Sequence, residues 1–321
     1  MNARAHARPS LPQRRLGASG LSVSLLSLGS WRTFERIPRE EGLAVMRAGR
    51  EAGITFLDDA RYDDETGSAP IPTGWSEVVF GELFRDAGWV RDEVVVANKL
   101  WWEFWPEQEA AGELDASLGR MGLDHIDLIY TMQPPEGLSV EELVGQVAAV
   151  VSSGRARSWG IGNWPADQLV EAVRAARALG VALPAAAQLP YSLVRPDWVQ
   201  DPVMEGVLAD ADIGLVASYV LAGGTLTGKY LRGENGRAET DETPAIVTGK
   251  QRASAVVDLA REWGVTPASL AFSFALAHPR LASVLFGATS PEQLQENVAS
   301  LAVFHSLTTE QHGQLRELST A

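Results

Sequence analysis

The fold is decided by one stretch of the sequence, Gly53-Ile54-Thr55-Phe56-Leu57-Asp58-Asp59-Ala60, in which a short apolar run ends on two carboxylates. A second run of the same kind, Val94-Val95-Val96-Ala97-Asn98-Lys99, ends on a lysine. Short β-branched and aliphatic runs are typical of parallel strands that are buried on both faces. The two stretches therefore predict neighbouring buried strands that carry charged side chains at their carboxyl ends.

Outward from these two runs, six more apolar runs alternate with amphipathic stretches. The eight predicted strands are Leu25–Leu28, Ile54–Leu57, Val94–Ala97, Ile126–Tyr130, Ser158–Ile161, Ala185–Leu189, Leu215–Ala217 and Ser283–Phe286. Predicted helices between them include Arg39–Ala52, Glu107–Met121, Val140–Ser153 and Ala166–Leu179. This alternation favours a closed (β/α)8 TIM barrel, with a doubly wound open sheet as the alternative. No Gly-x-Gly-x-x-Gly turn follows the first run, which lowers the open-sheet interpretation.

Length and composition limit the domain organisation, the partners and the location that the chain can have. The chain has 321 residues, 45% of them hydrophobic, and a formal net charge of −14. We predict a flexible tail over residues 1–13 and one barrel domain over residues 14–321, with Gly17–Gly20 turning a small hairpin that closes the barrel floor. The negative charge argues against nucleic acid or anionic membrane as partners. The chain has no cysteine and no apolar run long enough to cross a bilayer, so we expect a cytoplasmic protein.

Two predicted loops are long enough to cover the barrel mouth, Arg61–Gly74 and Arg232–Thr248. Long loops over a mouth are often functional lids, and the alternative is a surface insertion without a role. The sequence favours neither interpretation.

Polar side chains follow most of the predicted strands and would converge at one mouth. These residues are Asp58, Asp59, Tyr62, Lys99, Asn163, Gln188, Tyr191, Ser218 and Tyr219. A partly desolvated Lys99 beside Asp58 is expected to lower the pKa of a nearby tyrosine, which would make that phenol a proton donor near neutral pH. The alternative is an ion pair that only stabilises the barrel. No spacing of histidine and acidic residues predicts a metal site.

Seven segments, in order along the chain, resemble the aldo-keto reductase superfamily. They are Leu16–Ser24, Gly29-Ser30-Trp31, Gly53–Ala60, His125–Leu128, Gly160–Asn163, Gly223–Tyr230 and Gly287–Asn297. The resemblance covers nearly the whole chain and implies hydride transfer from NADPH to a carbonyl group. It also implies a catalytic set of Asp58, Tyr62 and Lys99, with Met132 at the position where the family has a histidine. The implied cofactor-binding residues are Gly29, Ser30, Trp31, Asp58, Asn163, Gln188, Ser218, Tyr219, Leu221, Gly223, Lys229, Gly287, Thr289, Gln293 and Asn297.

The chain departs from the family pattern at several of these positions. A thioether at Met132 cannot donate a hydrogen bond, Gln133 is the nearest side-chain donor, and His125 lies at the other end of its predicted strand. Tyr62 follows Asp58 by four residues, where five is usual in the family. Thr289 replaces a common cationic residue, so a preference for NADPH over NADH is an expectation only.

Two functions follow from these features, and a third class is weakened. The leading hypothesis is an NADPH-dependent oxidoreductase acting on a carbonyl or a conjugated C=C or C=N bond of an apolar small molecule, with Tyr62 as proton donor. The alternative is an NADPH-binding redox sensor or regulatory subunit with little turnover. A barrel lyase or isomerase without nicotinamide is weakened by Gly287–Asn297. Three tryptophans follow Lys99 closely, and they either line the mouth for a flat substrate or pack against the next helix and hold it in place. They are Trp101, Trp102 and Trp105. The sequence leaves the oligomeric state and the substrate open.

Overall fold

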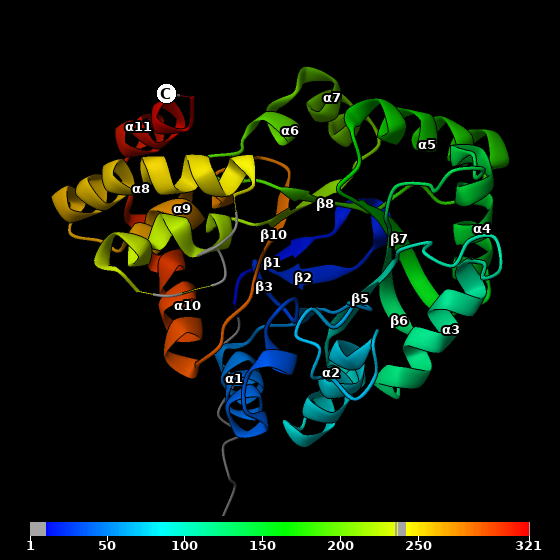
Figure 1. Ribbon diagram of the computed structural model, residues 1–321. Helices are drawn as coiled ribbons and strands as arrows, with labels where there is room; N and C mark the ends of the chain where they lie inside the picture. Colours follow the sequence, from blue (N-terminus) through cyan, green and yellow to red (C-terminus); the bar gives the residue numbers. More distant parts are fainter. Residues whose placement is uncertain (1–10, 235, 237–241, 321) are drawn as a thin grey trace, which may run out of the picture.

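Eight parallel strands close into a barrel at the centre of the molecule (Figure 1). The structure is a computed structural model and describes residues 11–234, 236 and 242–320. The strand order is β10-β3-β4-β5-β6-β7-β8-β9, with β10 and β9 paired to complete the ring. The strands are β3 (Leu26–Gly29), β4 (Phe56–Asp58), β5 (Val95–Leu100), β6 (Ile126–Thr131), β7 (Ala156–Gly162), β8 (Ala186–Pro190), β9 (Gly214–Ser218) and β10 (Leu281–Phe286). The predicted (β/α)8 TIM barrel is confirmed, and all eight apolar runs contribute a strand.

Helices surround the barrel in a ring, and each connects one strand to the next or follows the last (Figure 1). The ring consists of α1 (Arg39–Ala52), α2 (Trp75–Asp86), α3 (Ala110–Met121), α4 (Val140–Ser152), α5 (Ala166–Leu179), α7 (Pro202–Asp210), α9 (Pro267–Leu276) and α10 (Pro291–Ser306). Three further helices are α6 (Asp197–Gln200), α8 (Pro244–Trp263) and α11 (Thr309–Thr320). The bounds of α1 and α5 are those that their apolar periodicity predicts, whereas α3 begins at Ala110 rather than Glu107.

The barrel floor is closed by a hairpin of β1 (Gln13–Arg15) and β2 (Ser22–Ser24), as predicted. Leu16 and Val23 are fully buried and belong to the apolar cluster inside the barrel. The turn, η1 (Gly17–Ser19), begins with a glycine at φ 53°, and a Cβ at Gly17 would lie 2.3 Å from the carbonyl oxygen of Ala185. Only glycine fits this contact. β1 begins at Gln13, inside the predicted tail, of which residues 1–10 lie outside the described residues.

The two predicted long loops differ in outcome. Asp63 and Thr73 form an isolated antiparallel bridge within Arg61–Gly74, and the rest of that segment is loop, as predicted. The prediction for Arg232–Thr248 was wrong in part, because α8 already begins at Pro244, where proline suits the first helical turn. Residues 235 and 237–241 of that segment lie outside the described residues.

Short 3-10 turns complete the connections: η2 (Phe34–Arg36), η3 (Arg91–Glu93), η4 (Ala222–Thr227) and η5 (Lys229–Arg232). Within the described ranges, the structure contains no helix with the length and apolar character that a membrane crossing requires.

Candidate active site

A lysine, an aspartate and a tyrosine meet at the carboxyl ends of β4 and β5. Lys99 Nζ donates to Asp58 Oδ1 at 2.5 Å and to the Tyr62 hydroxyl at 3.3 Å. Asp58 pairs with Ala97 across the two strands. Lys99 lies two residues further along β5, so its side chain leaves the strand on the same face as that of Ala97. Asp58 and Lys99 are both buried, with exposures of 2% and 6%, so this ion pair is largely removed from solvent.

Gln188 completes the surroundings of the Asp58 carboxylate. Its amide nitrogen Nε2 donates to Asp58 Oδ2 at 2.8 Å, so both carboxylate oxygens of Asp58 have a side-chain partner. Gln188 was predicted to hold a nicotinamide amide group. Asp58 engages one of the two N–H donors of this amide nitrogen, so Gln188 can still offer a ligand its second N–H and its amide oxygen.

The sequence did not single out Tyr130, which lies fully buried inside the barrel among the same groups. Burial and the Asp58 carboxylate raise the pKa of this phenol well above its usual range, so it stays protonated. Tyr130 lies on β6, two residues before Met132. Because side chains alternate along a strand, this spacing was the available signal that Tyr130 points inward below the mouth.

The electrostatics of Tyr62 differ from the prediction. Lys99 was expected to lower the pKa of this phenol, but burial raises it well above its usual range, and the Asp58 and Asp59 carboxylates add to the effect. The positive charge of Lys99 is paired with Asp58, which weakens its pull on the phenol. Tyr62 is therefore a neutral, protonated phenol.

Asp59 does not join Asp58 and Lys99, although the sequence placed both carboxylates at the mouth. Ser30 donates its hydroxyl hydrogen to Asp59 Oδ1, and Asp59 Oδ2 is buried with no hydrogen-bond partner among the described residues. Burial, followed by the charge of Glu77 on α2, raises the pKa of Asp59 well above its usual range. Successive side chains on a strand point to opposite sides, which accounts for the separation of Asp59 from Asp58.

Met132 directly follows β6, and its sulfur lies beside Gly162, where a Cβ would be only 2.8 Å from Sδ. Gln133 is exposed, and its Nε2 donates to the carbonyl oxygen of Asn163, which fixes its side chain in that contact. His125 precedes β6 and lies at the floor end of the barrel, as predicted. Gln133, the nearest predicted donor, is therefore engaged elsewhere and is not placed to act for the family histidine.

Aromatic side chains line part of the mouth. The rings of Trp31 and Tyr219 lie 6.3 Å apart, and Trp101 packs edge-on against Tyr62 at 6.0 Å. Trp102 is buried and donates to Thr131 Oγ1 at 2.9 Å, so it holds the loop after β5 in place. Tyr191, which the sequence placed among the polar groups at the mouth, is instead buried against Phe274 of α9, because it follows β8 on its outer side.

Most of the predicted cofactor-binding residues lie at or after the ends of three neighbouring strands, whereas Asp58 lies on β4, Asn163 follows β7 and Gln188 lies on β8. In the barrel order β9-β10-β3, these residues extend from Tyr219 to Lys229 after β9, from Gly287 into the first turns of α10 at Asn297, and from Gly29 at the end of β3 to Trp31. Near the start of α10, Gln293 Oε1 accepts from the backbone N–H and the hydroxyl of Thr289, and Ser290 caps the helix. The N-terminal end of a helix favours an anionic group.

Lys229 supplies a cation in the loop after β9. Its Nζ lies over the ring of Tyr230 at 5.0 Å, and its stem lies against Gly224, where a Cβ would be 2.9 Å from Cε. An ammonium group, a helix N-terminus and an aromatic pair on adjacent loops fit a dinucleotide phosphate and its nicotinamide ring. Within the described residues, no group of three or more histidine, aspartate or glutamate side chains could hold a metal ion.

A sequence profile described as "Aldo/keto reductase family" matches residues 25–320. The chain belongs to this family. The predicted resemblance is confirmed, and the family supports an oxidoreductase activity.

Named relatives span almost the whole chain. A protein from Escherichia coli strain K12 described as L-glyceraldehyde 3-phosphate reductase is 33% identical and covers 90% of this chain and 87% of its own. Two proteins described as probable voltage-gated potassium channel subunit beta are 32% identical in Oryza sativa and 30% identical in Arabidopsis thaliana. Each of these alignments covers 92% of this chain, with 93% of the rice protein and 92% of the Arabidopsis protein. The chain is thus similar both to a reductase and to channel subunits.

Proposed function

We propose that this protein is an NADPH-dependent oxidoreductase that reduces a carbonyl or a conjugated C=C or C=N bond, with Tyr62 as the proton donor. The observation that carries the proposal is the chain of contacts from Asp58 through Lys99 to the Tyr62 hydroxyl. NADPH would supply the hydride when bound. A protein that only bound the cofactor would not require a buried ammonium group beside a phenol.

The pKa of Tyr62 suits the role of a donor. Burial keeps the phenol protonated at neutral pH, so the proton is available before reduction begins. Once Tyr62 has given up the proton, the phenolate lies 3.3 Å from the Lys99 ammonium, which stabilises the new negative charge. Asp58 and Gln188 hold Lys99 in this position through the shared carboxylate.

The thioether at Met132 narrows the range of substrates that we expect. Loss of one hydrogen-bond donor to a developing oxyanion costs about 3 kcal/mol, or roughly a hundredfold in rate, so simple ketones are expected to be poor substrates. A polarisable thioether beside Gly162 and the ring of Trp101, which packs against Tyr62, suit an apolar or conjugated substrate. We propose that the substrate is a small molecule and that the reaction takes place in the cytoplasm.

The cofactor proposal rests on Lys229 and the start of α10 as the phosphate-binding groups. Titration of the cofactor-free protein with NADPH and with NADH, followed by quenching of tryptophan emission, tests it. We expect saturable binding of both nucleotides, tighter for NADPH, and at least about tenfold weaker NADPH binding in Lys229→Met. If neither nucleotide bound, the oxidoreductase proposal would fail.

A second candidate is an NADPH-binding regulatory subunit or redox sensor with little turnover. Met132 at the histidine position favours it, and so does the similarity to proteins described as channel subunits. Turnover separates the two candidates. A regulatory subunit would bind NADPH as tightly as the oxidoreductase but would oxidise it no faster with a carbonyl or enone present than without.

A further inference from the structure

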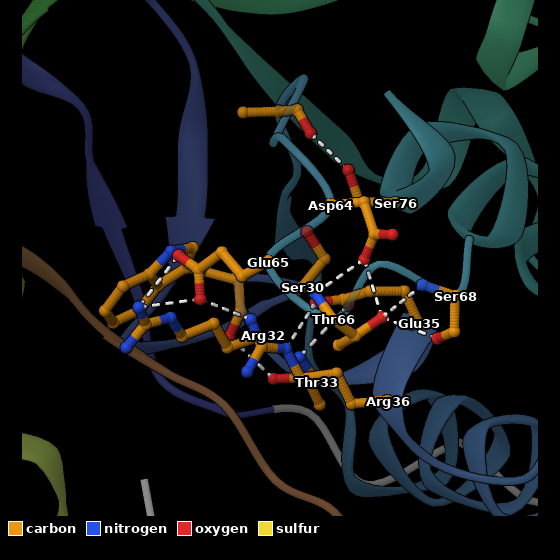
Figure 2. Close-up of polar contacts among 12 residues, drawn as sticks. Ser30, Arg32, Thr33, Glu35, Arg36, Asp64, Glu65, Thr66, Ser68 and Ser76 are labelled. Atoms are coloured by element: carbon orange, nitrogen blue, oxygen red, sulfur yellow. Dashed lines mark hydrogen bonds and ion pairs between the residues drawn. The ribbon is translucent and has the colours of Figure 1, made fainter. Parts of the chain in front are cut away.

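One carboxylate, Glu65, fastens the loop after β4 to two arginines in the loop after β3 (Figure 2). Arg32 Nη2 lies 2.8 Å from Glu65 Oε1 and 2.7 Å from Oε2, and Arg36 Nη2 lies 2.6 Å from Oε2. The two guanidinium groups hold the pKa of Glu65 below its usual range, so this carboxylate stays ionised. Glu65 thus acts as an anionic ligand to a pair of arginines.

This carboxylate lies beside the proposed proton donor. A cavity of about 80 Å³ is lined by Tyr62 together with Arg36 and Glu65, and also by Glu35, Asp63 and Asp64. Arg32 stacks on Trp31 at 4.8 Å, and the ring of Trp31 packs against that of Tyr219. The arginine pair therefore extends from the aromatic side of the mouth to the cavity that Tyr62 lines.

An arginine pair of this kind usually recognises phosphate or carboxylate, because the planar guanidinium matches two oxygens of an anion. Here the guanidinium groups already hold such an anion from the chain itself. Glu35 adds a second carboxylate that accepts from Arg36 Nε at 3.3 Å, and Asp63 adds a third that is 64% exposed. A further anion entering the cavity would meet net negative charge.

We propose that Glu65 is a specificity-determining residue that occupies the anion site of Arg32 and Arg36, so that the enzyme accepts uncharged or cationic carbonyl compounds and rejects anionic ones. The substrate preference rests on the proposed oxidoreductase function. The occupied anion site itself does not depend on turnover, so the two can be tested separately.

Inorganic phosphate is the probe for the anion site, with tryptophan emission as the readout, because Arg32 lies on Trp31. We expect phosphate to bind Glu65→Ala and Glu65→Gln at least about tenfold more tightly than it binds the wild-type protein. Glu65→Gln keeps the shape of the side chain and an acceptor oxygen for the arginines, so the loop should remain fastened. Asp63→Asn is the matched control, because it removes one charge from the same loop without freeing Arg32 or Arg36.

The proposal would be overturned if wild-type protein bound phosphate as tightly as the Glu65 variants, if the folded Glu65 variants bound none, or if Asp63→Asn gained the same affinity. The last result would mean that overall charge, and not the arginine pair, controls anion entry.

Competition between benzaldehyde and 4-carboxybenzaldehyde tests the substrate preference. We expect kcat/KM of the wild-type protein to favour benzaldehyde by about tenfold or more, and Glu65→Gln to reduce this preference while Asp63→Asn keeps most of it. A wild-type preference for the anionic aldehyde would contradict the proposal. If neither aldehyde nor any other carbonyl compound were reduced, the proposed function would fail, and the phosphate titration would still decide the role of Glu65.

Discussion

Lys99 Nζ lies 3.3 Å from the Tyr62 hydroxyl, although Tyr62 follows Asp58 at a spacing one residue shorter than the family pattern. The bridge between Asp63 and Thr73 and the hydrogen bond from Gly74 N–H to the Tyr62 carbonyl oxygen fix the backbone around the tyrosine. The loop after β4 therefore delivers the phenol to the buried lysine despite the altered spacing. This geometry makes the lysine and its aspartate the first residues to test.

Lys99→Met is expected to lower kcat by about a hundredfold or more, because the phenolate left by proton transfer loses the ammonium group beside it. Asp58→Asn should act in the same direction, since an amide holds the ammonium less firmly than a carboxylate. The measurement is steady-state turnover, with NADPH binding followed in parallel. Unchanged kcat in Lys99→Met, with intact binding, would assign the pair a purely structural role.

Met132→His tests whether the thioether limits reduction of simple ketones. A histidine there would restore a donor near the developing oxyanion, so kcat for such a ketone should rise by about a hundredfold. The control is Met132→Leu, which has no donor and should leave the slow rate unchanged. Equal rates in all three proteins would show that this position does not face the reacting oxygen.

The strands and the contact of Asp58 and Tyr62 with Lys99 were predictable because both depend on local features. Apolar runs mark buried strands, and polar residues directly after them share one end of the barrel. Asp59 was misplaced because it directly follows Asp58 and its side chain therefore leaves on the opposite side, and Tyr191 was misplaced because it follows β8 on the outer side of the barrel. The pKa of Tyr62 was predicted in the wrong direction, since burial of the phenol outweighs a lysine whose charge Asp58 already balances. The contact of Glu65 with Arg32 and Arg36 joins two loops that lie about 30 residues apart in the sequence, and no local sequence pattern predicts such a contact.

His278, which follows α9, gives the fold a specific pH dependence. Its Nδ1 accepts from the backbone N–H of Arg280, and burial lowers its pKa to about 4. The unfolded chain, with a histidine pKa near 6.5, binds the proton more readily, so this stability is fully present above about pH 6.5 and is lost as the pH falls toward 4.

We expect His278 to account for about 2 kcal/mol of the stability lost between about pH 7 and pH 5. Urea unfolding of the wild-type protein and His278→Gln at both pH values measures it. The variant should lose less stability than wild type over this interval, and an equal loss in both proteins would mean that other groups carry the effect.

The most direct test of the central claim uses NADPH that carries deuterium at the transferable position of C4 of the nicotinamide, with a panel of aldehydes, ketones and enones, in the wild-type protein and in Tyr62→Phe. We predict deuterium on a carbon of the reduced product with wild-type protein, and a rate lower by about a hundredfold or more in Tyr62→Phe, because the phenylalanine has no proton to give. Absence of deuterium from every product, or an undiminished rate in Tyr62→Phe, would contradict the account.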